Sequence, residues 1–269
     1  MTEGLHIADI VAGYGSRRVI DGLTLPLVPP GTVVGLIGAN GSGKSTLLKT
    51  VAGLLTGTAG GIRLDGDDLR RLPPAHRARR VGYLPQTVIR PSSLMVYEAL
   101  LSALRATWPE LSRARAEQRI EAVLGDLAIT ELALRPLDAL SGGQRQMIGL
   151  AQVLVREPRL MLLDEPTSAL DLRWQLSVLQ RVRDEARGRA AIALVAIHDI
   201  NLALRFCDRV AVLGNGLIAA GPPGDALTPD VLRRAFGVVA RVETCSRGRA
   251  MVMADGVAAD PEHHQEDTP

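Results

Sequence analysis

A glycine-rich segment at residues 38–46 has the spacing of a loop that binds phosphate. It reads GANGSGKST and fits the pattern G-x-x-x-x-G-K-[ST] without a mismatch, between an apolar run and a helical pattern. Glycines let the backbone wrap around phosphate oxygens, Lys44 supplies a positive charge, and the Ser45 hydroxyl is suited to Mg²⁺. A glycine turn without a ligand is the alternative, which this context disfavours. The candidate phosphate contacts are Gly38, Ala39, Asn40, Gly41, Ser42, Gly43, Lys44, Ser45 and Thr46.

Two adjacent carboxylates, Asp164 and Glu165, follow the apolar run at residues 160–163. Ligands of open parallel sheets bind at the carboxyl ends of strands. We expect Asp164 to hold Mg²⁺ through water and Glu165 to accept a proton from the attacking water. His198 directly follows the run 191–197, so it should emerge from the same edge and reach the γ-phosphate. A solvent-facing acidic strand end and a surface or capping histidine are the alternatives.

A second candidate anion site is LSGGQ at residues 140–144, which opens the helical pattern RQMIGLAQVLV. Ser141 is a candidate N-cap, and two glycines allow an anion to approach closely. By composition alone, the segment could equally be a capped helix. One γ-phosphate cannot easily contact both helix starts of one compact chain, so a second copy of the chain is an attractive partner.

The elements that position these residues follow from hydrophobic periodicity. Alternation predicts a strand over 5–10, and short apolar or β-branched runs predict buried strands. Turn residues become rare between 92 and 157, which indicates a helical insert, and the order strand, helix, strand after Pro158 predicts a parallel sheet. The other expected elements are strands at 31–37, 61–64, 160–163 and 190–197, helices at 45–55 and 172–186, a tight turn at Asp65-Gly66, a helix after Leu227 and a short strand near Arg241.

Composition restricts the class of protein. A length of 269 residues suits one large domain, and 46% hydrophobic with 22% charged residues is typical of a folded chain. The net charge of +2 is too small to indicate nucleic acid as a partner. Apolar runs fall short of the roughly 18 residues of a membrane span, and no secretory signal is evident. We therefore expect a cytoplasmic chain in which Cys207 and Cys245 stay reduced.

In order and spacing, these motifs resemble those of the nucleotide-binding subunit of an ATP-binding cassette (ABC) transporter. The resemblance rests on GANGSGKST, LSGGQRQ, LMLLDE, SALD at 168–171 and His198, and it covers about Leu5 to Val242. It implies an α/β fold, namely a P-loop NTPase (RecA-like) core with an N-terminal antiparallel β subdomain and an inserted α-helical subdomain at about 88–158. The cassette would then span 1–242, and we expect the extension 243–269 to be a disordered tail.

The resemblance also implies roles for single residues. Two copies would close head to tail around two ATP molecules, each held between one copy's phosphate loop and the other copy's LSGGQ. Gln86, in YLPQ, matches the glutamine that contacts Mg²⁺ or the attacking water, and Tyr14 matches the aromatic residue that stacks on adenine. Asp171 would help to join the two sites. Without the resemblance, Gln86 would be a surface loop residue and Tyr14 an exposed ring. The implied signature contacts are Ser141, Gly142, Gly143 and Gln144, and the catalytic candidates are Lys44, Gln86, Glu165 and His198.

The expected function is an ATP-hydrolysing subunit at the cytoplasmic face of the membrane, with permease subunits, a second copy and a substrate-binding protein as partners. Segments 170–184 and 228–242 resemble the ATPases of bacterial importers for iron-siderophore, haem and cobalamin, although the segment after Gln86 departs from that group. The alternatives are an exporter ATPase and a soluble cassette ATPase acting on DNA or ribosomes. The latter class usually has long coiled-coil insertions or two cassettes, which this sequence lacks.

Two further segments carry weaker signals. The tail DPEHHQEDTP contains His263 and His264, which in such a tail are more often incidental than metal ligands. A cluster of arginines around His76 favours a solvated basic face, with a contact surface for the permease or for acidic lipid as the alternative. The cluster consists of Arg70, Arg71, Arg77, Arg79 and Arg80.

Overall fold

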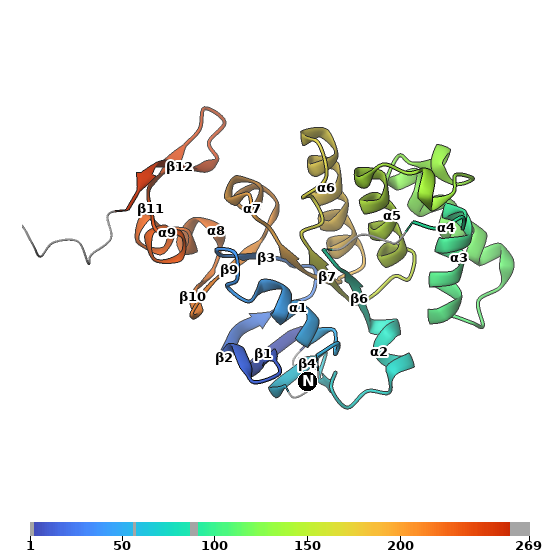
Figure 1. The fold of residues 1–269 in the computed structure, drawn as a ribbon, viewed down its shortest axis with the longest axis horizontal. Coiled ribbons are helices and arrows are strands. Elements are labelled where there is room, and N and C mark those ends of the chain that lie inside the picture. The colour runs from blue at the N-terminus through green and yellow to red at the C-terminus, as the bar shows by residue number, and fades with distance from the viewer. Residues whose placement is uncertain (1–2, 56–57, 87–90, 259–269) are drawn as a thin grey trace, which may run out of the picture.

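The computed structural model describes residues 3–55, 58–86 and 91–258, and a six-stranded sheet lies at its centre (Figure 1). Neighbouring strands are parallel except for the antiparallel pair at one edge, β10 and β9. The parallel sheet predicted from the strand-helix-strand order is therefore confirmed. In sheet order the strands are β10 (Gly216–Gly221), β9 (Arg209–Gly214), β3 (Val33–Ile37), β8 (Ile192–Ala196), β7 (Leu160–Asp164) and β6 (Val81–Leu84).

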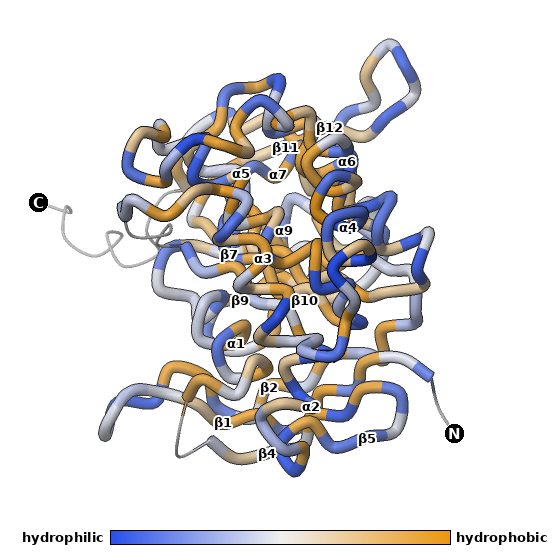
Figure 2. Tube along the Cα trace, turned by 90° about the vertical axis from the view of Figure 1, so that its right-hand side faces the viewer, coloured by the Kyte–Doolittle hydropathy of each residue, from blue (hydrophilic) through white to orange (hydrophobic). Residues whose placement is uncertain are grey.

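Strands β3, β7 and β8 are buried at every position, as expected for a parallel sheet that is covered on both faces. Alternate residues of β3 belong to two different hydrophobic clusters: Val33 and Ile37 face one cluster, and Val34 and Leu36 face the other. Figure 2 shows the apolar trace gathered at the middle of the molecule. The sheet thus separates two cores, which hold its two faces in place.

One core is closed by a second, antiparallel sheet, in the order β2-β1-β4-β5, together with helix α1 (Lys44–Val51). The tight turn predicted at Asp65-Gly66 joins β4 to β5, and both residues have positive φ angles, 52° and 90°. Helix α1 ends before the predicted position, because the chain turns at Gly53, where φ is 73°. The strands are β1 (Leu5–Tyr14), β2 (Arg17–Val28), β4 (Ala59–Leu64) and β5 (Asp67–Asp68).

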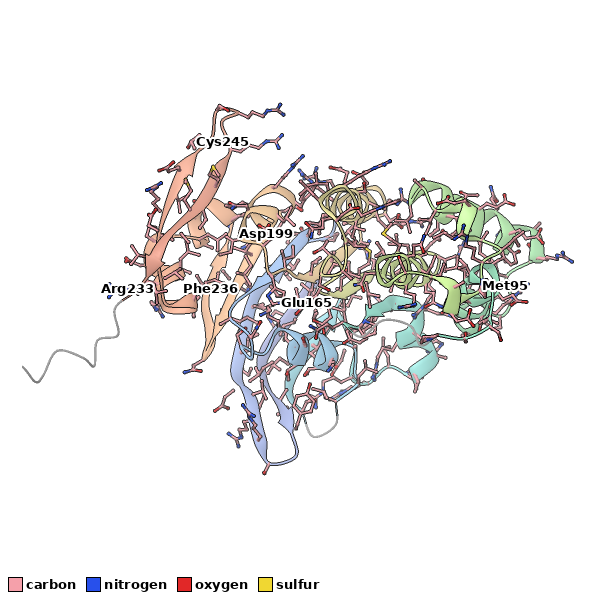
Figure 3. The ribbon with its side chains drawn as sticks, turned by 45° about the horizontal axis from the view of Figure 1, so that its top comes forward. Met95, Glu165, Asp199, Arg233, Phe236 and Cys245 are labelled. Carbon is pink, nitrogen blue, oxygen red and sulfur yellow. The ribbon has the colours of Figure 1, made fainter. Side chains whose placement is uncertain are left out.

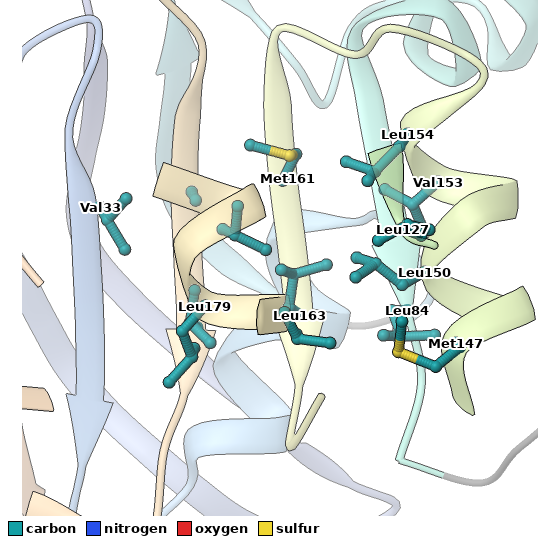
Figure 4. Close-up of a cluster of buried hydrophobic side chains, with 14 of the residues drawn as sticks. Val33, Leu84, Leu127, Met147, Leu150, Val153, Leu154, Met161, Leu163 and Leu179 are labelled. Atoms are coloured by element: carbon teal, nitrogen blue, oxygen red, sulfur yellow. The ribbon is translucent and has the colours of Figure 1, made fainter. Parts of the chain in front are cut away.

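The other core is covered by helices, including those of the predicted helical insert. Helix α5 lies against the sheet, where Leu150 and Val153 pack near Leu84 and Leu163 (Figure 4). The insert comprises α3 (Val96–Thr107), α4 (Arg113–Asp126) and α5 (Gly142–Leu154), with short 3-10 turns at Thr130–Leu132 and Leu137–Ala139. The remaining helices are α2 (Pro74–Arg80), α6 (Leu172–Gly188), α7 (Ile200–Phe206), α8 (Pro223–Ala226) and α9 (Pro229–Phe236). Within the described part of the chain, no helix is both long and apolar enough to cross a membrane.

The expectation of a disordered tail from residue 243 onward is wrong for residues 243–257. Strands β11 (Val238–Thr244) and β12 (Ala250–Val257) form an antiparallel hairpin at the opposite end of the molecule from the helical insert (Figure 1). The hairpin is ordered because Ala240 is buried and Val238 and Val252 pack against the helical core. His263 and His264 lie outside the described residues.

In the arginine cluster, Arg70 and Arg71 are exposed, as a solvated basic face predicts, whereas the other three arginines are partly buried by contacts within the chain. Arg77 donates to three backbone carbonyls, and Arg79 donates to the carbonyl of Thr107 and covers the ring of Trp108 at 4.7 Å. Arg80 pairs with the carboxylates of Asp65 and Asp67. These contacts tie α2 to its neighbours. Both cysteines are free thiols, and burial raises the pKa of Cys207 to about 12.

Asp65 links the antiparallel sheet to the central sheet. Its carboxylate accepts hydrogen bonds from the amide of Gly4 at 3.0 Å and from Nε of Arg159, just before β7, at 2.9 Å. Arg80 lies 3.4 Å away. Burial alone would raise the pKa of Asp65, but the hydrogen bonds from Arg159 and Gly4 and the charges of Arg159 and Arg80 together hold it below its usual value.

Asp65→Asn should lower the free energy of unfolding by about 1–3 kcal/mol at pH 7, because the amide NH₂ then faces the Arg159 guanidinium. A depressed carboxyl pKa stabilises the fold above the unfolded-state pKa, and this contribution disappears as pH falls. The difference from the parent should therefore be constant between pH 7 and 5 and shrink below about pH 4. Urea unfolding at each pH measures it. Asp21→Asn, at an exposed ion pair with Arg18, is the control and should change little. A difference that does not vary with pH would contradict the assignment.

Candidate functional site

The phosphate loop joins the end of β3 to the start of α1. A side chain at Gly38 would place Cβ 2.3 Å from the carbonyl oxygen of Leu213, so only glycine fits there. Gly43 caps α1 with a φ of 95° and without a side-chain hydrogen bond, which leaves the first amide groups of the helix open to an anion. The Ser42 hydroxyl is buried and has no hydrogen-bond partner within the described residues. The loop thus presents donors that are free to bind an anion.

Lys44 holds a buried positive charge inside this loop. Its Nζ donates to the carbonyl oxygens of Gly38 at 2.6 Å and Ala39 at 3.0 Å, and the residue is only 6% exposed. Burial lowers the pKa of the Lys44 ammonium, while the carboxylates of Glu165 and Asp164 oppose that shift. Lys44 forms no ion pair with any other described residue, so its charge is available to an anionic ligand.

Asp164 ends β7 beside the start of α1 and is 1% exposed. It accepts hydrogen bonds from the Ser45 hydroxyl at 2.8 Å and the Tyr83 hydroxyl at 3.5 Å. Burial raises the pKa of Asp164, the hydrogen bond from Ser45 opposes this, and the nearby charge of Glu165 adds to it. A carboxylate and a hydroxyl oxygen side by side, next to a phosphate loop, are the hard oxygen donors that suit Mg²⁺. These residues therefore fit the metal that the sequence predicted.

Glu165 is held by residues from the two strands that flank β7. Its Oε2 accepts from Nε2 of Gln86, after β6, at 3.0 Å, and its Oε1 lies 2.5 Å from Nε2 of His198, after β8. The backbone of Glu165 has a φ of 53°, in the left-handed region that non-glycine residues rarely adopt. Its carbonyl accepts from Nε2 of Gln146 at 3.1 Å. The carboxyl edge of the sheet thus brings Gln86, Glu165 and His198 together.

A cavity of about 650 Å³ extends from this edge to Tyr14, a size suited to a nucleotide. Tyr14 is 48% exposed, and Nζ of Lys49 lies 5.8 Å from the centre of its ring. The exposed ring leaves a flat face for stacking. The cavity is lined by Tyr14, Arg17, Val19, the loop residues Asn40 to Thr46, Gln86, Glu165 and His198.

The LSGGQ segment opens a different cavity, of about 490 Å³, which shares no lining residue with the first. Ser141 caps α5: its hydroxyl accepts from the amide of Gln144 at 3.2 Å, and the Gln144 side chain accepts from the amide of Ser141 at 3.0 Å. Asp171 caps α6 by accepting from the amide of Trp174 at 3.0 Å, and it lines this second cavity with Gly143. One chain does not bring its LSGGQ to its own phosphate loop.

Two residues that contact the site were not predicted. Tyr83 lies one position before Leu84 on β6, opposite Leu162, which brings its hydroxyl to Asp164. Gln146 is 1% exposed on α5, with its amide on the carbonyl of Glu165. A glutamine two residues after LSGGQ, directly before the apolar run MIGLA, was the available signal for Gln146. The role of Tyr83 depends on the pairing of β6 with β7.

Residues 23–168 match the protein family described as ABC transporter. A hemin import ATP-binding protein of Nocardia farcinica is 43% identical over 82% of this chain and 76% of its own length. An iron(3+)-hydroxamate import ATP-binding protein of Bacillus subtilis is 36% identical over 91% and 92% of the two chains. The ferric enterobactin transport ATP-binding protein of Escherichia coli is 33% identical over 97% and 94%.

Solved structures of ABC transporter proteins also resemble the chain. The ATP-binding subunit of an ABC transporter aligns with a TM-score of 0.73 and 31% identity, over 87% of this chain and 93% of that one. A metal-chelate type ABC transporter in an inward-facing conformation aligns with a TM-score of 0.78 and 25% identity, over 95% and 98%.

Lys44→Arg should weaken ATP binding by about 30-fold or more, because a buried guanidinium cannot fit between the carbonyls of Gly38 and Ala39 and still leave its charge to the phosphates. Lys49→Arg is the matched control, since Lys49 is the only other lysine, lies on the same helix and is partly exposed. It should bind ATP within about threefold of the parent. Calorimetric titration measures both. Equal losses in the two variants would contradict the special role of Lys44.

Proposed function

The chain belongs to the ABC transporter family as a subunit that binds and hydrolyses ATP, and from this premise we propose that it drives the import of iron-containing chelates, such as haem or ferric siderophores, into bacteria. The position of Glu165 supports the catalytic part of this proposal. Its carboxylate is held between Gln86 and His198, and all three residues line the same cavity as the phosphate loop. The relatives that match along most of the chain are named for haem, ferric hydroxamate and ferric enterobactin. Their names favour import over export.

The proposed reaction is attack of water on the γ-phosphate of ATP. Glu165 accepts a proton from the water, and His198 and Gln86 hold the Glu165 carboxylate in its orientation. Lys44 and the open amides of α1 balance the charge that develops on the phosphate. When bound, Mg²⁺ would neutralise phosphate oxygens, held by Ser45 and, through water, by Asp164, with Gln86 nearby.

The permease and a second copy of the chain are the partners of such a subunit. We propose that two copies close head to tail, so that Ser141, Gly142, Gly143 and Gln144 of one copy meet the ATP held by the other, with Asp171 near the joint. Support comes from the separate cavities of the phosphate loop and LSGGQ in one chain. Closure would drive the permease between its two states, at the cytoplasmic face of the membrane, and a substrate-binding protein would deliver the chelate.

The proposed cassette spans 1–242, with its helical subdomain at about 88–158.

Glu165→Gln should reduce ATP turnover by about 100-fold or more while ATP binding persists, because an amide of the same size cannot accept the proton. Light scattering should then detect a dimer that ATP keeps closed. In cells that express the chain with its permease, the parent should support uptake of iron from haem or a ferric siderophore, and Glu165→Gln should not.

Glu117→Gln is the matched control, because Glu117 lies on the exposed face of α4 and pairs with Arg113. It should keep full turnover and uptake. Parent-level turnover in Glu165→Gln would show that Glu165 is not the base. Normal ATP turnover without uptake of any iron chelate would instead refute the proposed substrate class and leave the ATPase intact.

A further inference from the structure

Asn201, in the first turn of α7, fastens this helix to the C-terminal hairpin. Its Nδ2 donates to the carbonyl of Val252 at 3.2 Å, and its Oδ1 accepts from the amide of Val252 at 2.8 Å. One side chain therefore satisfies both backbone groups of a residue on β12, 51 positions away. An edge strand presents a row of unpaired backbone N–H and C=O groups. Because Asn201 bonds both groups of one residue, the two hydrogen bonds fix the position of α7 along β12.

The hairpin is itself held firmly on the body of the protein. Val238 and Val252 pack against the same core cluster as Phe206 of α7, and Ala240 is 7% exposed. The other face of the hairpin carries Arg241, which pairs with Glu243 and Asp255 of the hairpin itself. The inner face of the hairpin thus packs against the core cluster that includes α7. The ion pairs of Arg241 on the outer face are formed within the hairpin.

Helix α7 begins at Ile200, and only Asp199 separates it from His198. Asp199 caps it, with Oδ1 accepting from the amides of Asn201 at 2.8 Å and Leu202 at 3.0 Å. Figure 3 shows Asp199 between the hairpin, with Cys245 at its tip, and Glu165. Two residues separate the hairpin contact at Asn201 from His198, whose Nε2 lies 2.5 Å from Glu165. A shift of the first turn of α7 would therefore move His198 relative to the carboxylate.

We propose that Asn201 is a positioning residue for His198, and that the C-terminal hairpin β11–β12 sets the rate of ATP hydrolysis through it. The proposal rests on the proposed function, in which His198 orients Glu165. Asn201 does not line the cavity of the phosphate loop, and its side chain forms its hydrogen bonds with Val252. Asn201 affects the position of His198 through Asp199 and the first turn of α7. Val252 of the hairpin is the residue to which Asn201 is anchored.

The test uses the purified full-length chain, with its permease where turnover requires it. Asn201→Ala removes both bonds to Val252 and should lower kcat for ATP about threefold or more, because small misplacements of catalytic groups carry large rate penalties. KM for ATP should not change, because no residue of the hairpin lines the cavity that holds the phosphate loop. In a His198→Ala background, adding Asn201→Ala should cause no further fall in kcat.

Arg241→Ala is the control on the outer face of the hairpin and should leave kcat and KM at parent values. Thermal melts confirm that each variant is folded. An unchanged kcat in folded Asn201→Ala would overturn the proposal. So would an equal fall in the His198→Ala background, because Asn201 would then act by a route other than His198.

The NMR signal of the His198 ring gives a readout that does not need hydrolysis. Asn201→Ala should shift or broaden this signal, and Arg241→Ala should leave it unchanged. An unshifted signal in Asn201→Ala would overturn the inference even if ATP turnover of this variant falls. A parent that hydrolyses no ATP with or without its permease would refute the proposed function, and the ring signal would still decide whether Asn201 positions His198.

Discussion

Each chain holds its phosphate loop and its LSGGQ helix at two separate cavities, and the rest of the mechanism depends on this separation. Both sites are the starts of helices, and both are suited to an anion. The central sheet fixes the first at the end of β3, whereas the helical insert carries the second at the start of α5. A site that needs both must be assembled from two chains, so binding of ATP becomes a means of joining them. In the proposed function, that coupling lets a nucleotide do mechanical work on a permease.

At the carboxyl edge of the central sheet, positively and negatively charged side chains lie close together and are largely buried. Lys44 begins α1, and Asp164 and Glu165 lie at the end of β7. Burial shifts the pKa of Lys44 down and that of Asp164 up. Each shift means that the charged form is less favourable without a partner. In the proposed reaction, the triphosphate and Mg²⁺ would supply the missing charges of both signs. Glu165 gains its orientation from Gln86 and His198, and His198 in turn is tied through α7 to the C-terminal hairpin.

Much of the site could be predicted because its chemistry lies in contiguous motifs. The loop 38–46 and the pair Asp164-Glu165 each follow an apolar strand, so local pattern was sufficient to place them at one edge. Tyr83 could not be found this way, since its contact with Asp164 depends on how β6 pairs with β7. The strand predicted near Arg241 is β11, but its partner β12 and the hairpin that they form were missed. Its inward positions, such as Ala240, alternate over only a few residues among charged neighbours, and their burial depends on packing against α7 and α9.

The most direct test of assembly in trans compares two mixed dimers that carry the same two lesions, Lys44→Arg and Ser141→Asp. Aspartate still caps α5, but its charge repels phosphate. Mixed dimers are isolated through two different tags, and their ATP turnover is measured. If each site takes one phosphate loop and the other chain's LSGGQ, a dimer with the lesions on different chains keeps one intact site and hydrolyses ATP. A dimer with both lesions on one chain then has none and is inactive. The reverse pattern would show that each chain builds its site alone and would contradict the account.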